Sequence, residues 1–168
     1  FVFGALSGLA LKDEADVLVL GHGTDGGNQS LTASGRPKKP VTLVNSQLVV
    51  TGAYGDIMIY INLAEDFTGE LNLVQTNMWG SPNQAVSIPS GTVRLTQGAF
   101  SRNGVMGVVN EGGSVSVSGM EFKQLDALYD LLLDEQAVAG EAFGNLYASE
   151  GGRGRIEDLP GILRGTDY

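Results

Sequence analysis

The chain has 168 residues, of which 42% are hydrophobic and 17% charged, and its formal net charge is −9 at pH 7. This length suits one domain with a substantial core, and the apolar content argues against a disordered chain. The acidic balance argues against nucleic acid as the main partner, because phosphate binding needs clustered Lys and Arg. The lack of cysteine excludes disulfides, thiol catalysis and cysteine-based zinc sites.

The first eleven residues, FVFGALSGLAL, are uncharged and mostly apolar. They have no charged leading region and no cleavage site, so we expect no intact signal peptide, and the start at Phe1 rather than Met suggests processing or trimming. No run in the chain approaches the roughly 20 apolar residues of a membrane span. The segment fits either a first strand of the domain's own sheet or a strand that pairs with a neighbour's exposed edge. In the second case the interface residues are Phe1, Val2, Phe3 and Leu6.

The stretch DVLVLGHGTDGGNQS, residues 16–30, begins as a buried strand and continues into a glycine-rich loop with His22 and Asp25. This loop is the strongest catalytic candidate, yet no G-x-S-x-G motif supplies an activated serine for the histidine. Its glycine spacing does not match a phosphate loop, and the acidic turns lack calcium-loop spacing. We therefore predict no catalytic residue, no cofactor and no metal site. The loop leads to a basic cluster of Arg36, Lys38 and Lys39, which we expect to contact a neighbour.

Alternation of apolar and polar residues dominates the next part of the chain and predicts half-buried strands. The clearest runs are 41–52, 54–65, 69–76, 91–100 and 113–119. Asn103-Gly104 lies between two such runs and is a strong hairpin signal. We find no internal repeat. About eight strands at this spacing predict a mainly β domain, an antiparallel β-sandwich or barrel.

One segment departs from this pattern and predicts an amphipathic helix near residues 120–136. Apolar residues recur there at helical spacing, Ser118 and Glu121 form a capping-box pattern, and Gly140 follows the expected end. Asp126, Asp130 and Asp134 then form an acidic stripe four residues apart. The stripe is either a solvated face or a surface that meets basic residues, namely the cluster in 36–39 or Arg153 and Arg155.

Two further features suggest contacts with other molecules. Met78 and Trp79 lie in a turn-rich segment, where an exposed pair would be a contact hot spot, although Trp79 folded over a barrel mouth fits equally well. We place a single domain at 1–150, with a tail at 151–168 that docks on this domain or on a neighbouring subunit.

These features favour a non-enzymatic structural subunit that self-assembles through strand pairing and loop contacts. Such a homo-oligomer would form an extracellular filament, a pilus-like fibre, or a phage or virion tube or surface. The alternative is a β-barrel binding module, secreted or on a bacterial cell surface. An enzyme is the third possibility, and the sequence offers no complete catalytic constellation for it.

Overall fold

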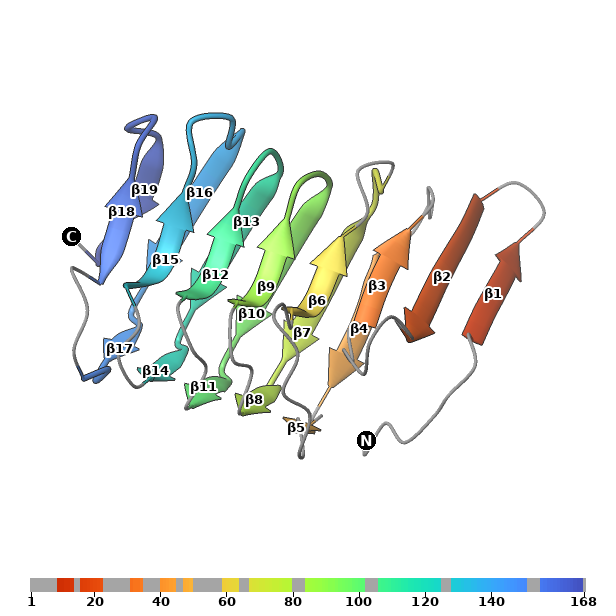
Figure 1. Ribbon diagram of the computed structural model, residues 1–168, viewed down its shortest axis with the longest axis horizontal. Helices are drawn as coiled ribbons and strands as arrows, with labels where there is room; N and C mark the ends of the chain where they lie inside the picture. The colour runs from red at the N-terminus through yellow and green to blue at the C-terminus, as the bar shows by residue number, and fades with distance from the viewer. Residues whose placement is uncertain are drawn as a thin grey trace.

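The structure is a computed structural model that describes residues 9–13, 16–22, 31–34, 40–44, 47–49, 59–63, 67–79, 84–101, 106–124, 128–150 and 155–167. These ranges contain nineteen strands and no helix, and the strands form three sheets (Figure 1).

Sheet A contains β1 (Leu9–Asp13), β2 (Asp16–His22), β3 (Leu31–Ser34), β6 (Ile59–Leu63), β9 (Gln84–Ile88), β12 (Met106–Asn110), β15 (Tyr129–Leu133) and β18 (Ile156–Asp158). Sheet B contains β4 (Val41–Val44), β7 (Glu70–Val74), β10 (Thr92–Thr96), β13 (Ser114–Ser118), β16 (Ala139–Phe143) and β19 (Leu163–Gly165). Sheet C contains β5 (Gln47–Val49), β8 (Asn77–Trp79), β11 (Ala99–Ser101), β14 (Glu121–Lys123) and β17 (Leu146–Tyr147).

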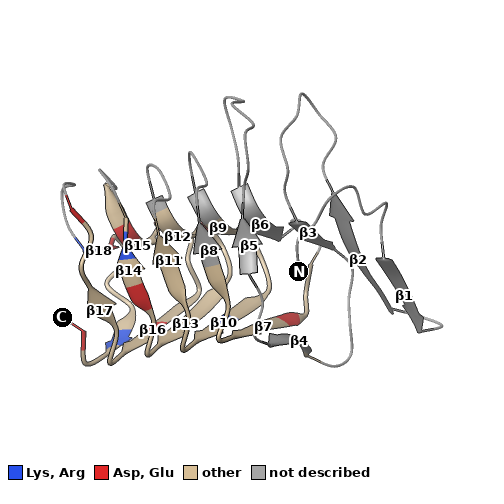
Figure 2. Ribbon diagram, turned by 90° about the horizontal axis from the view of Figure 1, so that it is seen from below, with Lys and Arg blue, Asp and Glu red and all other residues tan. Residues whose placement is uncertain are grey.

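The chain visits the three sheets in turn, one strand in each, and then begins the next turn beside the previous one. From β3 onward every described strand pair is parallel, whereas β2 pairs antiparallel with both β1 and β3. Sheets B and C meet at a corner and run side by side along the molecule (Figure 2). This arrangement is a parallel β-solenoid. Three successive turns, at 84–101, 106–124 and 128–147, show its geometry in most detail.

The turns stack in register, so the sequence does contain a repeat. Val93 pairs with Val115, Leu95 with Val117 and Phe100 with Phe122, each 22 residues apart. The next turn lies 25 residues further on, where Val115 pairs with Gly140 and Phe122 with Tyr147. The change of spacing comes from longer loops, and the polar residues vary freely, so the repeat is visible mainly in the apolar positions.

The predicted antiparallel sandwich or barrel is therefore wrong, although the chain is mainly β. The alternation located several strands well: Leu71, Leu73, Val93 and Leu95 are buried on one side of β7 and β10. Alternation specifies which face of a strand is buried but not which strand lies beside it. The Asn103-Gly104 turn lies outside the described residues, but β11 and β12 on either side belong to different sheets, so they form no hairpin.

The predicted helix near 120–136 is also wrong. Glu121–Lys123 and Tyr129–Leu133 are strands β14 and β15, and Gly140 lies inside β16. Glu121 forms no capping box. Its carboxylate forms an ion pair with Lys123, and Glu121 Oε1 lies 2.7 Å from Lys123 Nζ. Phe122 packs inside sheet C, and Leu131 and Leu133 pack inside sheet A. Two short strands, together with the residues between them, thus produced an apolar spacing that resembles a helix.

The core consists of columns in which each inward side chain rests on its counterpart one turn earlier. An aromatic column runs through sheet C: the rings of Phe100 and Phe122 have centroids 5.1 Å apart, and those of Phe122 and Tyr147 are 5.2 Å apart and parallel. Aliphatic columns run through the other sheets, for example Val86, Val108 and Leu131 in sheet A. At the corner between sheets B and C the chain adopts positive φ in four successive turns, at Gln75, Gln97, Gly119 and Gly144.

We predict that Phe122→Ala lowers the free energy of unfolding by about 3–5 kcal/mol, because the ring is fully buried between two other rings. Urea titration followed by circular dichroism measures this loss. Lys123→Ala is the matched control, since this neighbouring side chain is exposed and its ion pair is of the surface type. Equal effects of the two substitutions would contradict the aromatic column as a main source of stability.

Candidate functional site

The end of the solenoid formed by β17, β18 and β19 carries the best-defined candidate site, and we call it the C-terminal rim. These strands are the last members of sheets C, A and B within the described part of the chain. The N–H of Leu146 donates to the carbonyl of Met120, just before β14, and the N–H of Ala148 donates to the carbonyl of Phe122 in β14. Since backbone groups alternate in direction along a parallel strand, the N–H and C=O of Tyr147 point away from β14.

The same alternation applies to β18. The carbonyl of Arg155 accepts from β15, and the N–H of Leu159 donates to Leu133 of β15. The backbone groups of Ile156 and Asp158 therefore point toward the open side of the sheet. In the described part of the chain, β17 and β18 therefore pair with a strand on one side only.

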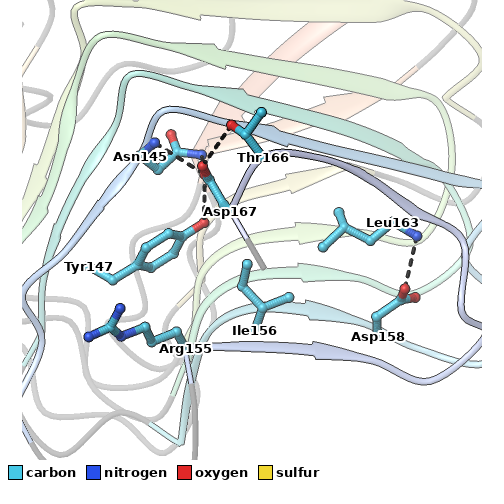
Figure 3. Close-up of a pocket in the computed structure, with 8 residues that line it drawn as sticks. All are labelled: Asn145, Tyr147, Arg155, Ile156, Asp158, Leu163, Thr166 and Asp167. Carbon is cyan, nitrogen blue, oxygen red and sulfur yellow. Dashed lines mark hydrogen bonds between the residues drawn. The ribbon is translucent and has the colours of Figure 1, made fainter.

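A cavity of about 590 Å³ opens at this rim, and Figure 3 shows the side chains around it. It is lined by Asn145, Tyr147, Arg155, Ile156, Asp158, Leu163, Thr166 and Asp167. Sheets A and B extend one strand beyond β15 and β16, whereas the last strand of sheet C in the described chain is β17. The cavity therefore occupies the position that a further strand of sheet C would take.

Tyr147 is the last ring of the aromatic column and forms one wall of this cavity. One face of its ring stacks on Phe122 with parallel planes, and the ring also lines the open space. Its hydroxyl donates to Asp167 Oδ2 at 3.2 Å. Burial, and then the charge of Asp167, raise the pKa of the Tyr147 hydroxyl well above its usual value of 10, so it stays a protonated donor.

Asp167 ties the last turn to the one before it. Its carboxylate accepts from the backbone N–H of Gly144 at 2.8 Å, from the backbone and side-chain amides of Asn145, and from Tyr147. Partial burial alone would raise the pKa of Asp167, but these hydrogen bonds together outweigh it and hold the pKa below its usual value of 3.8. Asn145 in turn accepts from the N–H of Met120 and donates to the carbonyl of Val117. The carboxylate is therefore occupied by the protein itself, so its role here is structural.

Asp158 is used in the same way. Its two carboxylate oxygens accept from the N–H groups of Ile162 and Leu163, at 3.1 and 2.9 Å, and so hold the turn between β18 and β19. Arg155 is exposed, and its guanidinium has no ion pair within 4 Å among the residues that the structure describes. The cavity thus combines an exposed cation at its edge with apolar and aromatic walls.

A second polar cluster lies near the corner between sheets C and A. Asp130 is 2% exposed, and its Oδ1 accepts from Gln124 Nε2 at 2.6 Å and from Ser149 Oγ at 2.7 Å. Burial raises the pKa of the Asp130 carboxyl, against the hydrogen bonds from Ser149 and Gln124 and the charge of Arg155. The amide oxygen of Gln124, Oε1, is buried and has no hydrogen-bond partner in the described structure. These contacts join two successive turns of the solenoid.

The structure separates the residues of the predicted acidic stripe. Asp130 is buried in the cluster just described, whereas Asp134 lies in the turn after β15 and accepts from the N–H of Glu135. Because the predicted helix is absent, the helical arrangement of Asp130 and Asp134 is wrong, and Asp126 lies outside the described residues. Arg155 is exposed, and its charge lowers the pKa of Asp130, which is the pairing of this prediction that occurs among the described residues.

The other predicted contact residues receive a backbone position at most. Met78 and Trp79 are in β8, in register with Phe100 and Ser101, and His22 is the last residue of β2. The residues outside the described ranges are Phe1, Val2, Phe3, Leu6, Arg36, Lys38, Lys39, Asp126 and Arg153. Sequence reasoning did not select Tyr147, Asn145 or Asp167. The spacing of Phe100, Phe122 and Tyr147 is the signal that identifies the first of them.

Within the described ranges, no three His, Cys, Asp or Glu side chains converge in a way that would hold a metal ion. The same part of the chain has no helix that is long and apolar enough to cross a membrane. Comparison with protein-family models, with curated proteins and with solved structures gives no significant match. The fold therefore defines the class as a parallel β-solenoid.

We predict that Asp130→Asn raises the melting temperature at neutral pH, because the ionised carboxylate is costly in its buried position. The pKa of Asp130 is higher in the folded state than in the unfolded chain, so its stabilising contribution grows as the pH falls toward 3.8. The wild type should therefore approach the variant between neutral pH and about pH 4. Thermal unfolding across this range checks the trend. Asp134→Asn is the control, and a gap between wild type and Asp130→Asn that does not change with pH would contradict the assignment.

Asp167→Asn should have the opposite sign. The pKa of Asp167 is lower in the folded state, so the carboxylate stabilises the fold above 3.8 and loses this effect as the pH falls through its folded value. The variant should melt at a lower temperature than the wild type at neutral pH, and the difference should shrink in acid. A loss of stability that is equally large in strong acid would show that Asp167 acts through packing rather than charge.

Proposed function

We propose that this chain is a non-enzymatic structural subunit that self-assembles by adding strands to the C-terminal rim. The observation that supports this most directly is that, among the described residues, β17 and β18 pair with a strand on one side only, and Tyr147, Ile156 and Asp158 line a cavity beside them. Unpaired edges of this kind are templates for strand addition. A homo-oligomer built in this way uses the same surface in every subunit.

The side chains at the rim favour the same function. Ile156 and Leu163 pack against the core on one side and line the cavity on the other. A terminal turn that ends a solenoid in water needs a polar outer face, since its apolar column otherwise meets solvent. Among the described residues, the cavity is lined by an aromatic ring and two aliphatic side chains, Tyr147, Ile156 and Leu163, which favours covering by another protein surface.

Assembly at this rim fits the composition of the chain. Charged residues make up 17% of the sequence, below the roughly 25% typical of soluble domains. A subunit whose ends are covered by neighbours needs fewer charges to remain soluble. An extracellular filament, a cell-surface fibre or a virion component is the setting in which we expect such a subunit. The alternative was a binding module built on a β-barrel, and the parallel solenoid contradicts the barrel.

We predict that the chain associates as its concentration rises and that Ile156→Lys abolishes this association. A lysine at position 156 places a charge in the cavity and against any added strand. Leu159→Lys is the matched control, because Leu159 is 52% exposed and does not line the cavity. Sedimentation velocity over a wide concentration range, together with circular dichroism of both variants, measures the effect.

A wild-type chain that remains monomeric at all concentrations would overturn the proposed function. Equal loss of association in both lysine variants would show that association does not use the rim.

A further inference from the structure

The corner between sheets C and A brings a buried amide and a buried carboxyl group together. Gln124 is 1% exposed and Asp130 is 2% exposed. Gln124 Nε2 donates to Asp130 Oδ1 at 2.6 Å, and Ser149 Oγ donates to the same oxygen at 2.7 Å. The other atom of the amide, Gln124 Oε1, has no hydrogen-bond partner in the described structure. With Asp130 ionised, this cluster is therefore short of one hydrogen-bond donor.

We propose that this corner is a proton-binding site, in which protonated Asp130 and the amide of Gln124 form a reciprocal hydrogen-bonded pair. Gln124 Nε2 continues to donate to Asp130 Oδ1, and the proton on Asp130 Oδ2 is donated to Gln124 Oε1. The oxygen and one N–H of a planar amide lie along the same edge, so this edge can meet both oxygens of a carboxyl group. A carboxylic acid can donate in this way and a carboxylate cannot. The proton thus removes the cost of leaving a buried oxygen unpaired.

The charges around Asp130 leave it as the group that titrates at this corner. Within the described chain, the ionisable side chains that interact with Asp130 are Arg155, through its charge, and Tyr147. A guanidinium is always charged, and burial raises the pKa of the Tyr147 hydroxyl further above neutral pH. Burial also raises the pKa of the Asp130 carboxyl, against the hydrogen bonds from Ser149 and Gln124 and the charge of Arg155. A change in the cluster between neutral pH and about pH 4 therefore reports the proton on Asp130.

The proton strengthens a contact between two successive turns of the solenoid. Gln124 ends the turn at 106–124, whereas Asp130, Ser149 and Glu150 belong to the chain that stacks on it. The backbone N–H of Gln124 donates to Ser149 Oγ at 2.9 Å, and its carbonyl accepts from the N–H of Glu150 at 2.9 Å. A second hydrogen bond on the Gln124 amide fixes the residue that makes these contacts. Acid therefore tightens this corner, a property that is independent of the proposed assembly.

The test is an NMR titration of the full chain, labelled with carbon-13 and nitrogen-15, from neutral pH to about pH 4. We expect the carboxyl carbon of Asp130 and the side-chain amide of Gln124 to shift together, with one midpoint above 3.8. Asp130→Asn supplies an N–H donor at every pH, so the Gln124 amide should no longer shift in this variant. Asp134→Asn is the matched control, because Asp134 lies in the turn after β15 and outside the cluster, and the wild-type titration of Gln124 should remain.

Hydrogen exchange of the same samples measures the effect on the corner. The protection of the Glu150 N–H, relative to the Gln97 N–H that donates to Ser118 at the corner between sheets B and C, should rise as the pH falls. The expected gain is about tenfold for each unit by which folding raises the pKa of Asp130. A Gln124 amide that does not shift while Asp130 titrates would overturn the reciprocal pair. An Asp130 carboxyl that titrates at or below 3.8 would overturn the proton-binding site.

Discussion

The in-register stacking of inward side chains is the constraint on which the rest of the structure depends. Each buried side chain must fit the one 22 or 25 residues before it and the one after it, so the core is a set of columns with few contacts between distant turns. Loops between sheets vary in length without disturbing the columns, as the longer turn after β15 shows. Stability in such a fold is close to a sum over neighbouring turns.

Hydrogen bonds of polar side chains stabilise the corners between the sheets of the solenoid. Asn110 is fully buried, accepts from the N–H of Gly113 and donates to the carbonyl of Ala139, so it fixes one corner and the next turn together. Asn145 does the same at the corner between sheets B and C, and Asp158 holds the corner between β18 and β19. Each of these residues satisfies backbone groups that no strand can reach.

The sequence allowed the strands to be located but not their partners. Leu71, Leu73, Val115 and Val117 alternate with polar residues, and alternation is a local property that survives in any sheet. Parallel pairing depends instead on residues more than twenty positions apart, and Gly140 beneath Leu163 shows how little the members of one column need to resemble each other. The segment from Phe122 to Leu133 misled for a related reason, since the apolar residues of two strands and of the sequence between them imitated helical spacing. Tyr147 was missed because its importance lies in its place at the end of a column, which no short motif records.

The buried amide of Asn110 has a consequence for how the chain avoids errors during folding. A stack of near-identical turns can slip by one whole turn at little cost, because every column then still meets a column of the same kind. Asn110 interrupts an aliphatic column between Ile88 and Leu133, and its amide finds its partners only in one alignment. A slipped stack would leave that amide buried among methyl groups, at a cost of roughly 1–3 kcal/mol. The buried amide of Asn110 thus favours one alignment of neighbouring turns over a slipped one.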